Sequence, residues 1–379
     1  IRRSPAAAAV LLENNDVPKL GFVVKQPDLA NTMNAVATGG FDGFYKGEIA
    51  KKLVDGVKAA KGIWSLEDLQ NYKIVERPAI SGKYHDLRIT SAAPPSSGGI
   101  ALLTILNILS GYPLETMDKI KRTHLIVEAM RRAYRDRAIY LGDPDFVDVP
   151  SFQLLHSYYA AGLRASIHPE KATASETLPG IEIPPQGKDT THFSVIDRDG
   201  NRVAATLTIN YPFGSGFMPP GTGVSLNDEM DDFSAKPGTP NAYGLVGAEA
   251  NAIAPGKRPL SSMSPTFIEN ERGVAVLGTP GGSRIITMVL LAILEYVDGG
   301  MPQSMVGLPR FHHQYLPDKI FYEEGAFDQN QLAALEEKGH QPEQTPWAYG
   351  NMQVVFWDRK KNQVHAASDP RVIGKAEVK

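Results

Sequence analysis

A pair of neighbouring threonine hydroxyls is the first feature of the sequence that could do chemistry. Thr190 and Thr191 stand in the run Asp189–Ser194, where a polar segment gives way to a pattern typical of a β-strand. A threonine hydroxyl is a poor nucleophile unless a base lies beside it. A cut before Thr190 would create an α-amino group with a pKa near neutrality, and that group could act as the base. The simpler interpretation is that two β-branched residues open a strand, and this short run alone favours it.

Four later segments carry further polar or glycine residues: Thr208–Asn210, Leu226–Phe233, Lys257–Thr266 and Thr279–Arg284. Each has a structural interpretation when it is considered alone. The second could be a solvated acidic turn, and the third could be a local cap. The fourth contains Gly281 and Gly282, which could break the chain before a helix or form an anion site at that helix's N-terminus.

Taken in order, these segments resemble the small-subunit half of the γ-glutamyltranspeptidase family, the glutathione hydrolases. The resemblance covers nearly all of residues 190–371 and ends in Ala367–Arg371. Upstream, three segments resemble the later part of that family's large subunit: Phe44–Gly47, Pro94–Gly99 and Tyr140–Pro144. Several long motifs in the same order are far more specific than any one short pattern.

The resemblance implies an α+β fold, the four-layer αββα sandwich of the N-terminal-nucleophile hydrolases. In such proteins a precursor cleaves itself before a threonine, and here the cut would fall between Asp189 and Thr190. Residues 1–189 would then be the C-terminal part of a large subunit, and residues 190–379 would be the small subunit. The two pieces would form one αββα domain jointly.

The resemblance also assigns catalytic roles. Thr190 would attack the γ-carbonyl to form a γ-glutamyl ester, and its new amine would be the general base. Thr208 would bond to the surroundings of the nucleophile. Gly281 and Gly282 would form the oxyanion hole, because glycine lets backbone N–H groups approach the tetrahedral oxygen closely.

Substrate-binding roles follow in the same way. Asn210, Glu229 and Asp232 would hold the substrate α-ammonium, which is reasonable because a buried cation needs carboxylate partners. Many bacterial members have glutamine at the position of Glu229, so this residue departs from one common version of the motif. The hydroxyls of Ser261 and Ser262 would bind the α-carboxylate.

Residues 237–248 resemble the lid loop that covers the pocket in many members, with Tyr243 at its tip. This loop favours a glutathione-type enzyme over lid-less relatives that act on capsule poly-γ-glutamate. We expect Tyr211 and Phe213 to line the acceptor side, although Phe213 could equally be a core residue.

The resemblance implies neither a metal nor an organic cofactor. His312 and His313 are adjacent, so on a helix or strand their side chains point apart, and we expect a structural role. The three residues Asp143, Asp145 and Asp148 suit a turn after a long helix better than a calcium site.

One element of the family is missing from the sequence. The large subunit normally has a further N-terminal region with an arginine, in an Arg-Glu-x-x-Pro-type segment, that pairs with the substrate α-carboxylate. No such segment precedes Ile1. A fragment, a gap closed by renumbering and a shortened variant would each explain this. Only the last would put carboxylate recognition in doubt.

The elements that must position these residues can be read from hydrophobic periodicity. The first half of the chain favours helices and the second half favours β-hairpins. We expect a helix over about 28–37 with Asp28 as its cap, and a short helix that begins at a capping box at 65–68. Further helices are expected over 46–60, 100–109 and 283–297, and an amphipathic helix over 117–140. We expect a linker or exposed loop over 165–188 and hairpins from 192–196 with 202–209, 266–269 with 274–277, and 353–357 with 364–367.

Composition limits the remaining possibilities. The 379 residues carry 39 Lys plus Arg and 42 Asp plus Glu, a net charge of −3, which argues against a general nucleic-acid or membrane-surface binder. The absence of cysteine excludes disulfides, thiolate nucleophiles and cysteine-ligated metals. The longest apolar stretch, near 285–294, is too short to span a bilayer. A periplasmic or secreted location is an expectation of the family alone.

The leading hypothesis is therefore a self-processing γ-glutamyl hydrolase and transpeptidase. It would open γ-glutamyl amides such as glutathione, transfer the group to water or to an amino acid or peptide amine, and assemble as a heterodimer of large and small subunits. One alternative is a related acylase acting on glutaryl β-lactams such as cephalosporins, or on capsule polymer. Another is an unprocessed, non-catalytic relative that only binds γ-glutamyl ligands.

Overall fold

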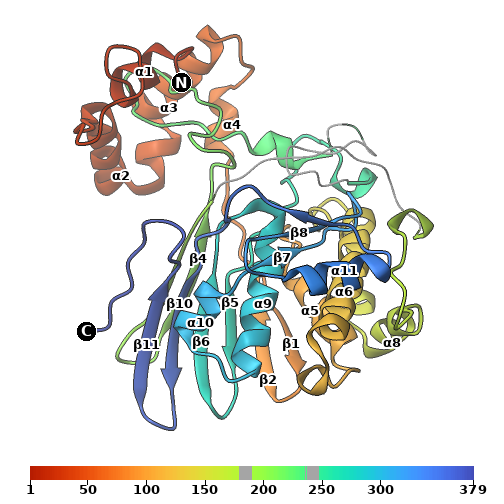
Figure 1. The fold of residues 1–379 in the computed structure, drawn as a ribbon. Coiled ribbons are helices and arrows are strands. Elements are labelled where there is room, and N and C mark those ends of the chain that lie inside the picture. The colour runs from red at the N-terminus through yellow and green to blue at the C-terminus, as the bar shows by residue number, and fades with distance from the viewer. Residues whose placement is uncertain (179–189, 235, 237–246) are drawn as a thin grey trace. The chain divides into compact units, whose positions relative to one another are not determined.

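The computed structural model describes residues 1–178, 190–234, 236 and 247–379. These residues divide into two compact units (Figure 1). Unit 1 comprises Ile1–Arg77 and Thr208–Glu229, and unit 2 comprises Pro78–Leu207 and Met230–Lys379. Each unit is therefore discontinuous in sequence, and each is described by itself.

Unit 1 is helical, with α1 (Pro5–Leu11), α2 (Pro27–Tyr45), α3 (Gly47–Ala59) and α4 (Leu66–Gln70). The predicted stripe on α3 is confirmed, because Ile49, Leu53 and Val57 are buried. The capping box is also confirmed, since Ser65 and Asp68 bond reciprocally at the start of α4. The prediction that Asp28 caps α2 was wrong. Pro27 takes the first helical position, where its missing N–H costs no hydrogen bond, and α2 continues through a kink at Gly40 to Tyr45.

A six-stranded antiparallel sheet forms the centre of unit 2. Its strand order is β1 (Ile80–Tyr84), β2 (Leu87–Ser91), β5 (Thr266–Glu269), β6 (Gly273–Gly278), β10 (Gln353–Asp358) and β11 (Gln363–Ser368). The hairpins β5–β6 and β10–β11 confirm the predictions. The hairpin β1–β2 corrects the expectation of a largely helical first half. Of these short strands, β2 pairs with β5, for example Ile89 with Ile268, and β1 joins the sheet through β2. The contact with β5 is invisible in the local sequence.

Helices pack on one face of this sheet and bury the main core (Figure 1). They are α5 (Gly98–Leu109), α6 (Lys119–Tyr140), α9 (Ile285–Val297) and α10 (Pro302–Gly307), with α7 (Ser151–Leu154) and α8 (Ser157–Ala165) beside them. Nearly every residue of α5 and α9 is buried. The amphipathic prediction for α6 was wrong, because its charged residues Glu128, Arg131, Arg132 and Arg137 are buried too.

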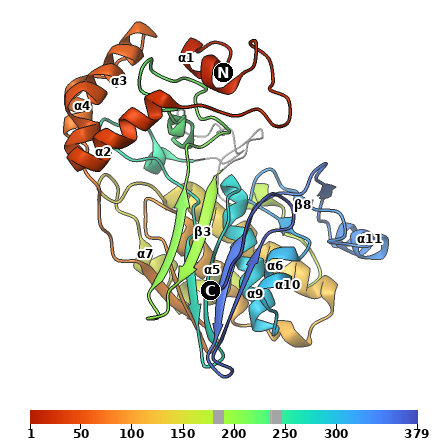
Figure 2. The same ribbon diagram turned by 90° about the vertical axis from the view of Figure 1, so that its left-hand side faces the viewer.

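The predicted hairpin near residue 200 is confirmed as the two-stranded sheet β3 (Thr191–Ile196) and β4 (Arg202–Leu207). It lies beside β6 and β10, on the side of the large sheet away from α9 (Figures 1 and 2). Its other face is open, with Phe193 45% and Leu207 57% exposed. The described residues thus stack as helices, sheet and sheet, and the α+β prediction is confirmed.

A small sheet completes unit 2. It contains β7 (Phe311–His312), β8 (Ile320–Tyr322) and β9 (Pro342–Gln344), and it is joined to α11 (Gln329–Glu337). Single 3-10 turns occur at η1 (Leu114–Thr116), η2 (Ser175–Thr177), η3 (Glu229–Asp232), η4 (Glu249–Asn251) and η5 (Gly282–Arg284). Among the described residues, no helix combines the length and apolar character that crossing a bilayer requires.

Candidate active site

Thr190 lies directly before β3 and is partly buried. The next residue, Thr191, already pairs with Leu207 of β4, so the predicted start of a strand at this point is confirmed. Asp189 and the segment before it lie outside the described residues. The position of the cut between Asp189 and Thr190 therefore stays a prediction.

His192 fixes the start of β3 to the large sheet. Its ring lies so close to Gly278 that a Cβ on that glycine would stand 2.2 Å from His192 Cε1. Its nitrogens contact Thr206 Oγ1 at 2.8 Å and Ser194 Oγ at 3.0 Å. Burial lowers the pKa of His192 to about 4, so the ring is neutral near pH 7. Because Gly278 ends β6, Thr190 and the turn that follows β6 come to the same end of the sheet.

That turn contains Gly281 and Gly282. Both have positive φ, 143° and 57°, a backbone conformation that favours glycine. No described residue accepts a hydrogen bond from either glycine amide. The turn leads through η5 into α9, so its N–H groups stand near the positive end of a helix. The arrangement suits the predicted oxyanion hole.

The Ser261–Ser262 segment is bonded to the upstream Pro94–Gly99 motif. Ser261 N donates to Pro95 O at 2.9 Å, and Ser97 donates to Ser261 O through its backbone N at 2.8 Å and its hydroxyl at 2.7 Å. Two segments that the sequence analysis selected only for their resemblance to the family are therefore held together by hydrogen bonds. Ser262 is buried beneath it.

Arg137 of α6 is a residue that the sequence reasoning missed. Its guanidinium donates to Ser97 Oγ at 2.9 Å and to Ser262 Oγ at 3.1 Å, and the residue is only 4% exposed. Burial lowers the pKa of Arg137 to about 10, while the charge of Asp232 acts in the opposite direction. Arg137 therefore stays cationic at neutral pH. This buried positive charge supports the binding of an anion at Ser262. In the sequence, the only local sign of such a role for Arg137 was its place in an arginine-rich helix that ends at the Tyr140–Pro144 motif.

The residues predicted to bind the α-ammonium divide between the two units. Asp232 belongs to unit 2, and its backbone carbonyl accepts a hydrogen bond from Asn251 Nδ2 at 2.7 Å. Thr208, Asn210 and Glu229 belong to unit 1. The 3-10 turn η3 carries the chain from Glu229 to Asp232.

Within unit 1, two loops bring the predicted residues together. Asn210 N donates to Thr208 Oγ1 at 2.8 Å, and Asn210 Nδ2 donates to Asp228 O at 3.3 Å. Tyr211 N donates to Asp228 Oδ1 at 3.1 Å. Asn210 itself is buried and has a positive φ of 71°. The loop after β4 and the loop before η3 therefore position these side chains as a group, although their functional roles stay predictions.

Two other sequence predictions have simple outcomes. Tyr243 and most of the predicted lid, residues 237–246, lie outside the described residues. Phe213 is 50% exposed, which does not suit the core alternative.

The predicted structural roles of His312 and His313 agree with their contacts. His312 contacts Thr287 Oγ1 and Gln314 Oε1, both at 2.8 Å, whereas His313 Nε2 contacts Asp318 Oδ1 at 3.1 Å. The two rings therefore serve different partners. Asp143 is a turn residue, as expected, because its carboxylate accepts hydrogen bonds from the amides of Asp145 at 3.2 Å and Arg258 at 2.8 Å.

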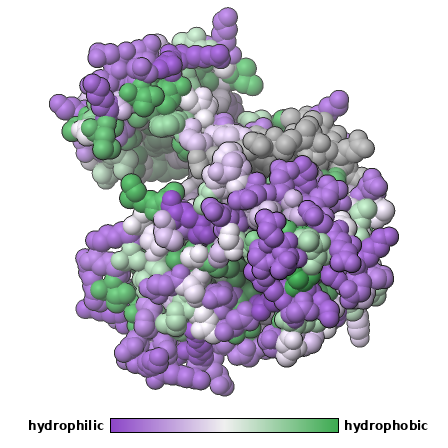
Figure 3. All heavy atoms as spheres, in the orientation of Figure 1, coloured by the Kyte–Doolittle hydropathy of each residue, from purple (hydrophilic) through white to green (hydrophobic). Residues whose placement is uncertain are grey.

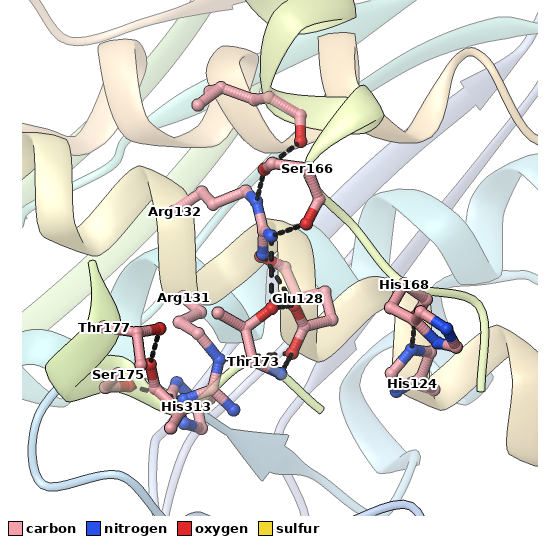
Figure 4. Close-up of polar contacts among 12 residues, drawn as sticks. His124, Glu128, Arg131, Arg132, Ser166, His168, Thr173, Ser175, Thr177 and His313 are labelled. Carbon is pink, nitrogen blue, oxygen red and sulfur yellow. Dashed lines mark hydrogen bonds and ion pairs between the residues drawn. The ribbon is translucent and has the colours of Figure 1, made fainter. Parts of the chain in front are cut away.

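The helix α6 carries a buried polar cluster that includes His124 and Glu128 (Figure 4). His124, Glu128 and His340 bring ligand atoms within 4.8 Å of one another. However, Glu128 already accepts hydrogen bonds from Arg131, from Arg132 at 2.6 Å, and from the amide and hydroxyl of Thr173 at 3.0 and 2.6 Å. Burial alone would raise the pKa of Glu128, but Arg131, Thr173 and Arg132 outweigh it and hold the pKa below its usual value. A dication would have to displace these donors beside two guanidinium groups, so the arrangement favours a buried ion-pair cluster.

Comparison with known proteins places these features in context. The family model described as gamma-glutamyltranspeptidase matches residues 1–378. The chain belongs to this family. Two relatives, each named glutathione hydrolase proenzyme, come from Pseudomonas sp. strain A14 and Escherichia coli K12. They are 44% and 43% identical over 96% of this chain, which covers 65% and 63% of their lengths. The chain thus spans slightly under two thirds of these relatives.

Among solved structures, cephalosporin acylase from Bacillus halodurans matches with a TM-score of 0.83 and 25% identity. The match covers 97% of this chain and 65% of that one. The predicted family and the predicted α+β fold of the N-terminal-nucleophile hydrolase type are therefore confirmed.

Proposed function

We propose that the protein is a self-processing γ-glutamyl hydrolase and transpeptidase with Thr190 as its nucleophile. The observation that carries the proposal is the position of Thr190 directly before β3. Two residues later on that strand, His192 packs against Gly278, which lies three residues before Gly281 in the sequence. Thr190 and the two glycines therefore lie toward the same end of the sheet. The description of the relatives as proenzymes supports activation by cleavage.

The proposed reaction begins when cleavage of the Asp189–Thr190 bond leaves an α-amino group on Thr190. That amine takes the hydroxyl proton as the oxygen attacks the γ-carbonyl of the substrate. The Gly281 and Gly282 amides stabilise the resulting oxyanion. Collapse breaks the amide bond, the departing amine receives the proton, and a γ-glutamyl ester remains on Thr190. Water or an acceptor amine then attacks the ester by the same route, which returns the hydroxyl and releases the γ-glutamyl product.

Recognition of a γ-glutamyl group requires sites for both of its α-charges. Ser262, backed by the buried Arg137 cation, supports the α-carboxylate. Asp232, whose charge acts on Arg137 within unit 2, supports the α-ammonium. For Asn210 and Glu229 of unit 1 the same role rests on the family resemblance. Glutathione and other γ-glutamyl amides are therefore the proposed substrates, with amino acids and peptides as acceptors.

The direct test uses a γ-glutamyl anilide with wild-type protein and Thr190→Ala. We expect the wild type to be cleaved into two chains and to release the anilide, and we expect the variant to remain uncut and inactive. Thr190→Ser is the matched control, because it keeps a hydroxyl and should retain cleavage and part of the turnover. Robust turnover by Thr190→Ala would overturn the proposal.

The acylase alternative is favoured by one observation, the structural match to a cephalosporin acylase. A glutaryl substrate lacks the α-amino group of a γ-glutamyl substrate, so Asp232 would have no cation to bind. We therefore propose that the γ-glutamyl anilide is preferred over the glutaryl anilide, and a reversed preference would support the acylase. A subunit heterodimer and a periplasmic or secreted location complete the proposal, and cell fractionation tests the location.

A further inference from the structure

We propose that Tyr134, Gln314 and His312 are positioning residues that hold the Gly281–Gly282 turn in the geometry an oxyanion needs. They act through Ser283, the residue that follows the two glycines. This inference rests on the proposed function, which makes the turn catalytic. The contacts themselves lie within unit 2 and do not depend on it.

Ser283 is held from both its backbone and its side chain. Its carbonyl accepts a hydrogen bond from the hydroxyl of Tyr134, which projects from α6. Its own hydroxyl donates to Gln314 Oε1 at 2.7 Å. Ser283 and Tyr134 are only 5% and 1% exposed, so water does not compete for these bonds. The residue next to Gly282 therefore has one position in the core.

The hydrogen-bond pattern behind Gln314 has a single consistent direction. Gln314 Nε2 donates to Leu316 O at 3.3 Å, which leaves Gln314 Oε1 as an acceptor. That oxygen accepts from Ser283 and from His312 Nε2 at 2.8 Å, so the imidazole proton lies on Nε2. His312 Nδ1, 2.8 Å from Thr287 Oγ1 on α9, is then an acceptor, and it shares the single Thr287 hydroxyl proton with Arg284 O at 3.0 Å.

His312 keeps this pattern at all ordinary pH values. Its ring is fully buried, and burial, together with the nearby Arg284 charge, lowers its pKa to about 3. A second proton would remove the acceptor that Thr287 faces. The neutral ring thus links Thr287 at the start of α9 to Gln314 after β7. Gln314 in turn accepts the hydrogen bond from Ser283.

The glycine pair explains why such support is needed. Gly281 and Gly282 adopt positive φ, a region that glycine samples together with many others, so the turn has little rigidity of its own. An oxyanion hole is effective only when its donors are already aimed at the developing charge. Loosening Ser283 should therefore slow the step that forms the oxyanion while leaving substrate binding nearly unchanged.

The test compares Tyr134→Phe and Ser283→Ala with a matched control, Tyr296→Phe. Tyr296 is 2% exposed, lies at the far end of α9, and donates to Asn270 Oδ1 at 3.0 Å. Tyr134→Phe and Tyr296→Phe thus each remove one hydroxyl from the core. We expect kcat for a γ-glutamyl anilide to fall roughly tenfold in Tyr134→Phe and Ser283→Ala, with KM changed less than about twofold. The pH profile should not move, since the Thr190 amine is untouched. Tyr296→Phe should keep wild-type kcat.

A second measurement on the same proteins is amide hydrogen exchange over residues 281–288. Exchange should accelerate in Tyr134→Phe and Ser283→Ala but not in Tyr296→Phe. If the wild type fails to turn over γ-glutamyl substrates, the proposed function is wrong, and the exchange comparison still tests the support of the turn. Wild-type kcat together with unchanged exchange in both variants would overturn the inference, and so would an equal loss of kcat in Tyr296→Phe.

Discussion

The two units of the molecule hold their polar residues in different ways. Unit 2 has a continuous core in which α5, α9 and the strand β6 are almost wholly buried. In unit 1 the only buried residue of the long helix α2 is Thr32. Apolar side chains such as Val23, Met33 and Ile63 of unit 1 are 71%, 59% and 95% exposed, and apolar residues are visible on its surface (Figure 3). The candidate site residues of unit 2 therefore belong to a well-packed body, whereas those of unit 1 belong to a lightly packed one.

This difference teaches how each group of site residues is positioned. In unit 2, Ser262, Arg137 and the Gly281–Gly282 turn are fixed by buried contacts between separate elements. In unit 1, Asn210 depends on local loop bonds to Thr208 and Asp228. Substitutions in unit 2 should consequently have the larger effects.

The largest effect is expected for Arg137→Met. The variant removes a buried cation behind Ser262, so kcat/KM for a γ-glutamyl anilide should fall roughly 100-fold to 1000-fold, mainly through KM. Arg122→Met is the control on the same helix, because Arg122 pairs with Asp298 at the surface and should leave kinetics unchanged. An Arg137→Met enzyme with wild-type KM would remove Arg137 from carboxylate recognition.

The next effect concerns stability rather than turnover. Glu128→Gln leaves Arg132 without its buried carboxylate and leaves Arg131 with Asp318 as its remaining ion-pair partner, so the free energy of unfolding should fall by about 3 kcal/mol. Urea denaturation measures the loss, and turnover per folded molecule should be preserved. The exposed pair Lys319–Glu343 provides the comparison, since Glu343→Gln should cost less than about 1 kcal/mol. Equal losses in the two variants would show that the cluster adds little to the core.

A smaller effect is expected in unit 1. Asn210→Ala removes the bond to Asp228 O and one proposed α-ammonium partner, so kcat/KM should fall about tenfold. A glutaryl substrate has no α-ammonium and should lose less. If both substrates lose activity equally, Asn210 supports the loop and does not recognise the ammonium.

The smallest effect is a difference in pH sensitivity. All nine histidines belong to unit 2, and burial lowers the pKa of His192 and His313 to about 4 and of His340 to about 3. The unfolded chain therefore binds more protons than the folded unit between about pH 6.5 and these values, and stability falls as the pH falls through that window. Each such histidine contributes at most about 1.4 kcal/mol per pH unit.

His340→Gln should reduce the slope of the unfolding free energy against pH by up to about 1.4 kcal/mol per pH unit, the equivalent of one proton. Urea titrations between pH 4 and 7 can measure this change. Unit 1 has no histidine and should show no comparable slope from this source. An unchanged slope in His340→Gln would mean that His340 titrates normally in the folded state.

Sequence reasoning was most successful where local patterns decide the structure. The stripe on α3, the Ser65 capping box and three hairpins follow from short-range periodicity and turn residues. It failed for β1 and β2, because β2 joins the sheet by pairing with β5, nearly 180 residues away, and β1 joins it through β2. It also missed the division into units, because Thr208–Glu229 returns to a body built from the first 77 residues.

For the site, Thr190 and the glycine pair were found through resemblance, and their spacing alone did not distinguish them from ordinary strand and turn residues. Arg137 was missed because its role depends on Ser97 and Ser262, which approach it only in the folded chain.

The central claim is that Thr190 becomes an N-terminal nucleophile. Denaturing intact-mass spectrometry of the purified protein, with N-terminal sequencing of each species, tests it most directly. The account predicts two chains that meet between Asp189 and Thr190, the second beginning with an unmodified Thr190 amine. A single uncut chain that still turns over a γ-glutamyl anilide would contradict it.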